Sequence, residues 1–498
     1  TAVKNGWTVK LVSSLASERA QSVMAEGGIN AALNTKGEED SPEQHYTDTL
    51  TAACGLADPN AVWGMTQAAS ELVRSLHHLG VQFNVTDDDE LDLRNFGGQK
   101  KKRTAFAQSD TGKQLMTALI DAVRREESAG TVERFPHHKF RTLLLSGNIC
   151  GGCTVQDTYT GELLRFVCDA VLIATGGLHG LFGDTTGSLA NTGEVTAELF
   201  RLGVPMANLE MIQYHPTTVE LGEKRMLLSE AARGEGGRLF ALRNGKPWYF
   251  MEEKYPELGN LMPRDITARE VWTVSRDYEV FLDMTELPKE VMEHKLAGLV
   301  DDCQTYLHKD IRKEPIPILP GIHYFMGGIQ VDERHRTSMR NLYAAGECCA
   351  QYHGANRLGG NSLLGAIYGG QIAAETACRE TVSSPNMPCA EESLLPELSP
   401  DAQMQMNRIL LNALGVVRDA QTLEAGIQEI RKLSGTLPLL GCAMLESALA
   451  RKESRGAHWR ADYPQRNDAV YCKTTVAHWN GQHIAISFES IPERRHDL

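Results

Sequence analysis

Three glycine-rich stretches, each placed after a strand-like run, constrain the fold of this chain more than any other feature. The three pairs are residues 7–12 with 22–28, the apolar run 170–174 with 175–177, and residues 341–345 with 346–347. Ligands of open α/β sheets bind at the carboxyl ends of parallel strands, where glycine lets the backbone approach closely. The continuous apolar run 170–174 is typical of a strand covered on both faces. Together the three stretches predict a dinucleotide cofactor.

The first residues resemble the end of a helix rather than the start of a domain. Residues 1–5 are typical of a last helical turn, with Gly6 as its stop, and residues 7–12 then form the predicted strand. A dinucleotide-binding unit runs in the order strand, Gly-rich turn, helix, strand. We therefore expect the first strand and its G-x-G-x-x-G turn to be missing from this sequence, which would weaken binding of the cofactor's pyrophosphate.

The remaining pattern predicts an interrupted α/β domain. Helices are expected from Asp58 to Gly80, over 110–127, from Asn191 and Thr192 to Gly203, over 361–380 and within 401–453, with antiparallel strands in 139–167 and short strands in 469–490. Residues 212–322 carry more charge and proline. The predicted fold is a Rossmann-like domain (1–211 and 323–385) interrupted by an α+β capping domain (212–322) and followed by a helical domain (386–468) and a tail (469–498), with a proline-rich linker in 383–400.

Composition excludes several classes of function. The chain is 42% hydrophobic and 23% charged, as soluble globular proteins are, and its net charge of −14 disfavours a nucleic-acid binder. No apolar run is long enough to span a bilayer. The 11 cysteines show no framework spacing, which favours a reducing compartment. Cys150 and Cys153 are interpreted as unrelated thiols in a hairpin, and no metal or iron–sulfur ligand set is predicted.

A second group of residues is rich in cations. His215, Arg233, Arg264, His323 and Arg357 stand beside Gly or Pro rather than on helix faces. Taken singly, such residues are more often structural. If they converge beside a cofactor they would suit a small dianion, because Arg binds carboxylates through two parallel hydrogen bonds.

These residues belong to longer motifs, which together carry a family resemblance. The motifs are residues 22–32, 213–217, 229–237, 263–265, 323–328, 344–347, 353–363, 455–458 and 461–464. Over nearly its whole length the chain resembles the flavoprotein subunit of succinate dehydrogenase and fumarate reductase. The resemblance implies FAD as the cofactor, a C4 dicarboxylate as the substrate, and hydride transfer between flavin N5 and one carbon of the succinate/fumarate pair.

The resemblance also implies roles for the cationic group. The substrate carboxylates would be held by His215, Ser229, His323 and Arg357, with Ser229 in place of the usual Thr. Arg264 matches the proton-transferring Arg. Because Arg is normally a permanent cation, this role needs a relay, which Glu230 and Arg233 would provide from one helix face. A structural ion pair is the alternative interpretation of Glu230 and Arg233.

FAD contacts are implied for ten residues. They are Ser22, Gly27, Gly28, Thr175, Gly176, Gly177, Glu194, Glu347, Ser362 and Leu363. Glu194 stands where many members have Asp, and Glu347 would accept a hydrogen bond from the ribityl chain, or would otherwise be an N-cap-like carboxylate. Many members bind FAD covalently through a His, but this chain has Gln21 there. We therefore expect non-covalent FAD, a lower flavin potential and a mild bias towards fumarate reduction.

Electrons must leave the flavin, so the resemblance implies an iron–sulfur subunit and, through it, a membrane anchor. The chain is then expected in the cytoplasm, peripheral on the inner face of the cell membrane, as part of a respiratory complex. Two alternatives remain: an enzyme like L-aspartate oxidase, and a non-catalytic scaffold that has lost FAD binding. The intact set of Arg264, His215, His323 and Arg357 argues against the scaffold.

Overall fold

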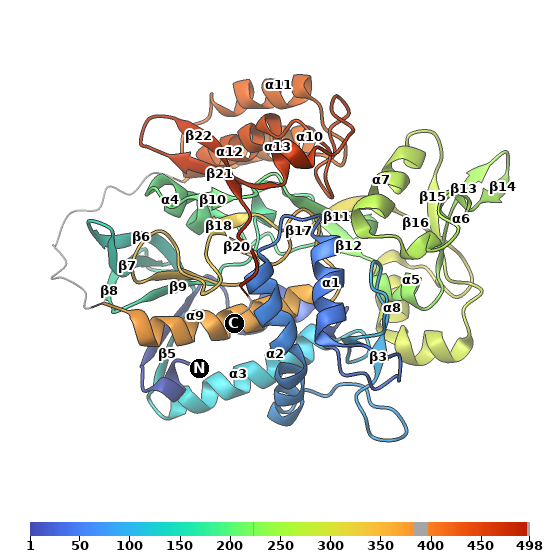
Figure 1. Cartoon of the computed structure of the whole chain (residues 1–498), viewed down its shortest axis with the longest axis horizontal. Coiled ribbons are helices and arrows are strands. Elements are labelled where there is room, and N and C mark those ends of the chain that lie inside the picture. Colours follow the sequence, from blue (N-terminus) through green and yellow to red (C-terminus); the bar gives the residue numbers. More distant parts are fainter. Residues whose placement is uncertain (223, 383–396, 496–498) are drawn as a thin grey trace.

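The computed structural model describes residues 1–222, 224–382 and 397–495 (Figure 1). Several predicted helices are confirmed with their caps. Helix α2 (Pro59–Leu79) begins at Asp58, whose carboxylate accepts from the N–H of Asn60 at 2.8 Å, and ends at Gly80 with φ 116°. Helices α3 (Thr111–Ser128) and α9 (Asn361–Glu380) also lie where the sequence predicts. In Figure 1 these three helices lie together in the lower part of the molecule.

The three predicted strand runs lie in two short parallel pairs of strands. Strand β1 (Val9–Ser13) pairs with β5 (Val132–Pro136), and β9 (Val171–Ile173) pairs with β19 (Leu342–Ala344). Gly6, with φ 82°, ends a short helical turn before β1, as predicted. The prediction that 170–174 is covered on both faces is wrong, because Leu172 is 40% exposed while Ile173 faces the core.

Smaller elements complete this part of the chain. They are α1 (Pro42–Ala52), a sheet of β2 (Ile29–Asn30), β4 (Thr104–Ala105) and β3 (Leu93–Arg94), an antiparallel sheet of β6 (His138–Ser146), β7 (Ile149–Asp157) and β8 (Leu163–Val167), and α4 (Glu194–Arg201). Cys150 and Cys153 lie on β7 of the predicted hairpin. Helix α4 begins after Gly193 rather than at Asn191 or Thr192, because Gly193 takes the left-handed conformation at the cap.

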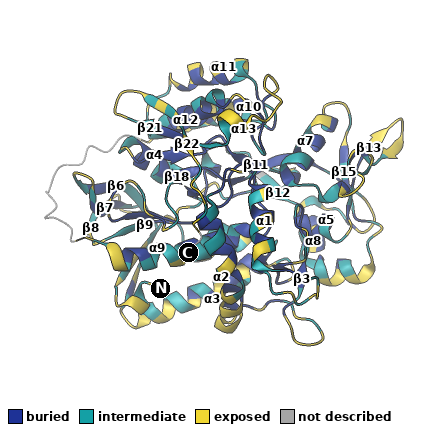
Figure 2. Ribbon diagram, in the orientation of Figure 1, coloured by how far each residue is buried: buried dark blue, intermediate teal, exposed yellow. Residues whose placement is uncertain are grey.

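The inserted region forms the right-hand lobe of Figure 1. It contains β11 (Ile212–Leu221), β12 (Lys224–Leu227) and β17 (Leu319–Phe325) in one sheet, β13 (Arg238–Arg243), β14 (Lys246–Trp248), β15 (Val280–Asp283) and β16 (Ile316–Pro317) in another, and helices α5 (Glu230–Gly234), α6 (Phe250–Lys254), α7 (Arg264–Ser275) and α8 (Ala297–Asp302). The lobe has its own apolar core around Leu239, Val271 and Leu282. Figure 2 shows β11 in the buried centre and the tip of the β13–β14 hairpin exposed.

The C-terminal region packs against the first part of the chain. Helices α10 (Pro400–Ala413), α11 (Ala420–Ile430) and α12 (Thr436–Ala450) share one core with α4, and a short α13 (Asp468–Tyr471) follows. The tail strands β21 (Lys473–Trp479) and β22 (Ile484–Ser490) extend the sheet of β20 (Cys349–Ala350), β18 (Gly328–Gln330) and β10 (Met206–Ala207). Residues 383–396 of the predicted linker and helical domain lie outside the described residues.

A buried ionic cluster, termed here the C-terminal cluster (Glu210, Arg451, Glu453 and Arg455), ties these parts together. Arg451 donates to Glu210 Oε1 at 2.7 Å and to Glu453 Oε1 at 3.0 Å, and Arg455 Nε donates to Glu453 Oε1 at 2.7 Å. All four side chains are buried. Within the described ranges, no helix combines the length and hydropathy needed to cross a membrane.

Candidate active site

A buried ion relay lies where α5 and α7 begin. Glu230 and Arg233 are one turn apart on α5, and Arg264 is the first residue of α7. Glu230 Oε2 accepts from Arg264 Nε at 2.8 Å, and its Oε1 accepts from Arg233 Nη2 at 3.1 Å. The three side chains are at most 6% exposed. The shared face predicted for Glu230 and Arg233 is thus present, and one carboxylate bridges both guanidinium groups.

The relay holds Glu230 ionised. Burial by itself would raise the pKa of Glu230, but the charges of Arg264 and Arg233 and their hydrogen bonds bring it below its ordinary value. The N–H of Gly97 also donates to Glu230 Oε1 at 3.2 Å. Burial lowers the pKa of Arg233, although Glu230 opposes this effect. The ionised carboxylate of Glu230 therefore connects two buried guanidinium groups by hydrogen bonds.

Two amides that the sequence analysis did not assign connect the relay to Arg357. Gln213 accepts from Arg264 Nη1 at 3.1 Å and donates to Asn356 Oδ1 and to the carbonyl of Arg357, both at 2.9 Å. Gln213 is fully buried. Gln213 lies in the motif 213–217 and Asn356 in the motif 353–363. Membership of these motifs is the sequence feature that could have identified the two amides as site residues.

The two predicted histidines meet across the β11–β17 sheet. Their rings lie 5.1 Å apart. Between the pairs Gln213–Tyr324 and Tyr214–Ile322, β17 contains one extra residue, so His323 sits on a β-bulge. Bulges re-aim side chains and are common beside active sites. The sequence pattern did not predict this bulge.

Both imidazoles are neutral at ordinary pH. Burial, together with the charge of Arg264, holds the pKa of His215 and of His323 well below the usual value. His215 Nδ1 lies 3.2 Å from Thr217 Oγ1, whereas its Nε2 is buried without a hydrogen-bond partner. His323 Nδ1 lies 2.8 Å from Thr186 Oγ1. The open Nε2 of His215 is available to a ligand.

Arg357 is a buried cation without a matching anion. It is 3% exposed, it forms no ion pair with any described residue, and its Nε has no hydrogen-bond partner. Burial, together with the charge of Arg264, lowers its pKa to about 9. A buried unpaired charge is costly, so the geometry calls for an anionic ligand.

Ser229 caps helix α5. Its hydroxyl accepts from the N–H of Ala231 at 3.4 Å as the cap of α5, and it also hydrogen bonds with Glu26. Glu26 was not assigned from the sequence, although it lies within the stretch 22–28. Burial, with added repulsion from Asp302, raises the pKa of Glu26 to about 8.

The second and third glycine-rich stretches meet. A Cβ on Gly177 would lie 2.6 Å from Glu347 Oε1, and one on Gly176, where φ is +72°, would lie 2.6 Å from Asn191 Nδ2. Glu347 Oε1 accepts from the N–H of Phe325 at 3.0 Å, and His179 Nε2 lies 3.5 Å from the same oxygen. A larger residue at Gly177 would displace the side chains of Glu347 and Phe325, and one at Gly176 would displace Asn191 and be strained by the positive φ.

The glycines of the first stretch lie close to Ala105 and Phe96 rather than to the other two stretches. A Cβ on Gly28 would lie 2.5 Å from the carbonyl oxygen of Ala105, and one on Gly27 would lie 3.1 Å from the ring of Phe96. Gln21 Oε1 accepts from the N–H of Ser188, which joins this stretch to the loop before α4. The other predicted cofactor residues are placed as follows: Ser22 in the short helix with Gln21, Thr175 directly after β9, Glu194 at the start of α4, and Ser362 and Leu363 in the first turn of α9.

These stretches fit the expected FAD. Glu26 Oε2, His179 Nε2 and Asn191 Nδ2 are buried without hydrogen-bond partners, and they belong to or face the three glycine-rich stretches. Open buried acceptors and donors beside close backbone approach suit a polar cofactor such as a dinucleotide. No group of three or more His, Cys, Asp or Glu side chains in the described ranges could hold a metal ion.

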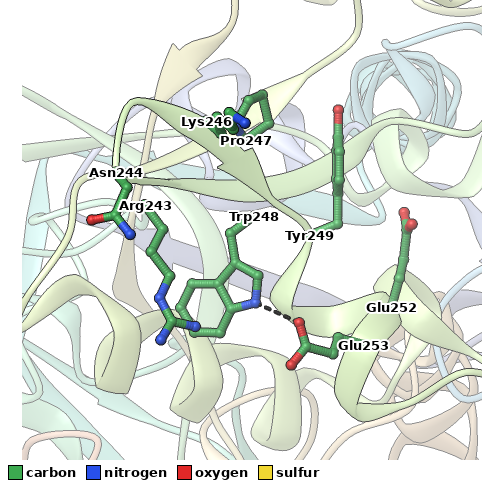
Figure 3. Close-up of a pocket in the computed structure, with 8 residues that line it drawn as sticks. All are labelled: Arg243, Asn244, Lys246, Pro247, Trp248, Tyr249, Glu252 and Glu253. Atoms are coloured by element: carbon green, nitrogen blue, oxygen red, sulfur yellow. Dashed lines mark hydrogen bonds between the residues drawn. The ribbon is translucent and has the colours of Figure 1, made fainter.

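A cavity elsewhere contains none of the predicted site residues. It measures about 800 Å³ and opens on the β13–β14 hairpin (Figure 3). Trp248 Nε1 donates to Glu253 Oε2 at 2.7 Å in its wall, and Arg243 lies over the Trp248 ring at 5.1 Å. This surface cavity is therefore separate from the buried cluster.

Comparison with known proteins agrees with the geometry. The family described as "FAD binding domain" matches residues 1–363, and that described as "Fumarate reductase flavoprotein C-term" matches residues 434–495. The succinate dehydrogenase flavoprotein subunit of Bacillus subtilis is 38% identical, over 98% of this chain and 92% of its own. L-aspartate oxidase of Streptomyces coelicolor is 31% identical, over 94% and 87%. The quinol fumarate reductase structure of E. coli superposes with a TM-score of 0.89 at 26% identity, covering 98% and 94%.

The fold and the matched domain define an FAD-binding oxidoreductase of mixed α/β architecture. Within that class, the chain belongs to the flavoprotein family of succinate dehydrogenase and fumarate reductase.

Proposed function

We propose that the protein interconverts succinate and fumarate with FAD, as the catalytic subunit of a respiratory complex. The observation that carries this proposal is the buried cluster of Arg264, Arg357 and His215, in which Arg357 Nε and His215 Nε2 have no hydrogen-bond partner among the described residues. A dicarboxylate would supply the missing anions. Family membership supports the same substrate class.

In this proposal Arg357 binds one substrate carboxylate through its guanidinium, and His215 and His323 donate hydrogen bonds. Because both imidazoles are neutral, they orient the substrate without adding charge. Ser229 would contribute its hydroxyl by turning from Glu26. Burial of Arg357, His215 and Ser229 excludes water and strengthens each contact.

Proton exchange is assigned to Arg264. When bound, FAD supplies the group that accepts or donates the hydride, at flavin N5. Arg264 would give or take a proton at the neighbouring substrate carbon. Glu230 Oε2 would exchange that proton with Arg264, and Glu230 Oε1 would exchange one with Arg233 Nη2, 3.1 Å away. The relay thereby restores the guanidinium, which a lone Arg could not do easily.

FAD is proposed to be held without a covalent bond, since Gln21 cannot attack the flavin. Acid precipitation of the FAD-loaded protein should therefore release yellow flavin into the supernatant, and flavin retained in the pellet would contradict this. Because the FAD is proposed to be non-covalent, its reduction potential should be lower than that of covalently bound FAD. The lower potential would favour fumarate reduction. A potentiometric titration that places the flavin well above the fumarate couple would overturn that bias.

Electrons are proposed to pass to an iron–sulfur subunit bound to a membrane anchor, with this chain on the inner, cytoplasmic face of the cell membrane. The support is family membership, because the Bacillus subtilis relative is named as a subunit. Co-purification of an untagged iron–sulfur protein with the tagged chain, together with its recovery in membranes, would test this. Purification of the chain alone from its native cells would contradict it.

L-aspartate oxidase activity is the competing function, favoured by the 31% identity to that enzyme. L-aspartate carries an ammonium group, which needs an acceptor. Both oxygens of Glu230 already accept hydrogen bonds, and the rest of the cluster is cationic or neutral. With an artificial acceptor, we expect turnover of succinate and little of L-aspartate. The reverse preference would overturn the proposal, and a colourless protein that cannot take up FAD would support a scaffold.

A further inference from the structure

The ring of Tyr324 lies under the guanidinium of Arg357, with 4.2 Å between Cζ and the ring centroid. We infer that Tyr324 is a positioning residue, which holds Arg357 in place by its aromatic face and leaves the positive charge free for a substrate carboxylate. This inference rests on the proposed function and deepens it, because it explains how the substrate-binding cation is held.

The surroundings of Tyr324 fix the orientation of its ring. Tyr324 follows the bulge at His323 and is the register partner of Gln213, the amide that also binds the carbonyl of Arg357. The ring is 7% exposed and packs among four buried apolar side chains, Leu56, Met211, Met326 and Ala355. His353 meets it edge to face at 5.3 Å. One face is therefore left for the cation.

A ring face holds a cation in a different way from a carboxylate. A buried carboxylate would attract the guanidinium strongly and would neutralise it before any substrate arrived. The quadrupole of a tyrosine ring attracts a cation more weakly and accepts none of its N–H bonds. Arg357 accordingly forms no ion pair with a described residue and keeps its Nε open. The guanidinium is thus oriented but not satisfied.

The opposing interpretation is that Tyr324 only fills space. Fluorination distinguishes the two interpretations, because it withdraws electron density from the aromatic face with little change in ring volume. A space-filling residue would not respond to that change. A leucine, in contrast, removes the face altogether and also perturbs the packing.

The experiment measures the Kd of malonate for the FAD-loaded chain by calorimetry. Tyr324→Phe serves as the reference, followed by mono-, di- and trifluorinated phenylalanine at the same position, and by Tyr324→Leu. We expect the Kd to rise stepwise along the series, by about tenfold in total, and at least as much for leucine. In turnover, KM should rise by a similar factor while kcat changes less than threefold.

Tyr352 provides the matched control. It is also buried, its ring lies 6.0 Å from that of His353, and its hydroxyl lies 2.6 Å from His335 Nε2. The same fluorinated series at Tyr352 should leave the Kd of malonate unchanged. A flat series at Tyr324, or equal series at both positions, would overturn the inference alone. An unmodified FAD-loaded chain that binds no malonate would overturn the proposed function, and the inference with it.

Discussion

Two buried charge clusters in this molecule differ chiefly in how fully their cations are paired, although Glu210 Oε2 in the C-terminal cluster is also buried without a hydrogen-bond partner. In the C-terminal cluster, Arg451 donates to five acceptors: Glu210, Glu453, the carbonyls of Tyr471 and Lys473, and Thr475. In the candidate active site, Arg357 forms no ion pair with any described residue, and His215 Nε2 is open. The side chains named here are buried in both clusters, so burial does not distinguish the two sites.

The difference indicates which cluster is scaffold and which awaits a ligand. A satisfied buried ion pair has little to offer a ligand, and breaking it exposes an uncompensated charge. A cluster with open donors is unstable in isolation but is prepared to bind an anion. Mutations in the first cluster should therefore act on folding, and mutations in the second should act on binding and turnover.

The largest effect is expected from Arg264→Gln in the active-site cluster. Loss of the proposed proton-transferring group should lower kcat by about 10²- to 10⁴-fold, whereas Glu230 keeps its partner Arg233 and the fold should be retained. Steady-state succinate–acceptor kinetics and thermal melting of the same preparation check this. If the Arg264→Gln variant unfolded instead of losing turnover, the proposed difference between the two clusters would be contradicted.

The opposite outcome is expected from Arg451→Met in the C-terminal cluster. Glu210 would be left buried without a cationic partner, whereas Glu453 would keep Arg455, so the free energy of unfolding should fall by about 3–5 kcal/mol. Urea denaturation checks this, with Arg334→Met as the control, since the Arg334–Glu380 pair is exposed and should be worth less than about 1 kcal/mol. Equal losses in the two variants would contradict the account.

A smaller effect is expected for the pH dependence set by Glu26. Its folded pKa, raised from 4.5 to about 8, stabilises the protein when the carboxyl is protonated. That stabilisation is complete below about pH 4.5 and is lost as the pH rises through about 8. Relative to Glu26→Gln, the unmodified chain should therefore lose stability between pH 5 and 8. Parallel unfolding curves of both proteins across this range would refute the assignment.

Glu230 should behave with the opposite sign. Its folded pKa is below the ordinary 4.5, so its stabilisation is present above that pH and is lost only as the pH falls through the lower folded value. Ser229 lies between the two carboxyls, as the cap that precedes Glu230 and as a hydrogen-bond partner of Glu26. Measuring Glu26→Gln and Glu230→Gln side by side at pH 3 to 8 separates the two contributions.

The smallest effect is expected for the imidazoles. Because burial and Arg264 keep His215 and His323 neutral, the KM for the dicarboxylate should not change by more than about twofold between pH 6 and 8 through their titration. Initial rates across this range check the expectation. An inflection near pH 6.5 that disappears in His215→Asn would show that the imidazole charge does contribute.

Local signals in the sequence predicted much of this fold. The caps at Asp58 and Gly80 located α2, and the alternation in 139–167 located the β6–β8 sheet. The pairing of β21 with β10 was not predictable, because it joins residues far apart in the chain and depends on tertiary packing.

The candidate site was predictable in residue type but not in detail. The i, i+3 spacing indicated the Glu230–Arg233 pair. The bulge at His323, the amide link through Gln213 and the face of Tyr324 under Arg357 depend on register and three-dimensional contacts, which no one-dimensional pattern contains. The exposure of Leu172 was missed for a related reason, since a continuous apolar run does not reveal which face is covered.

The central claim is that the unsatisfied cluster binds a C4 dicarboxylate beside FAD. The most direct measurement is anaerobic reoxidation of the dithionite-reduced, FAD-loaded chain by fumarate, followed by visible flavin absorbance. We predict that the oxidised spectrum returns with one fumarate consumed per flavin, and that Arg264→Gln slows this by about 10²- to 10⁴-fold. A flavin that stays reduced in fumarate and is reoxidised only by oxygen would contradict the account.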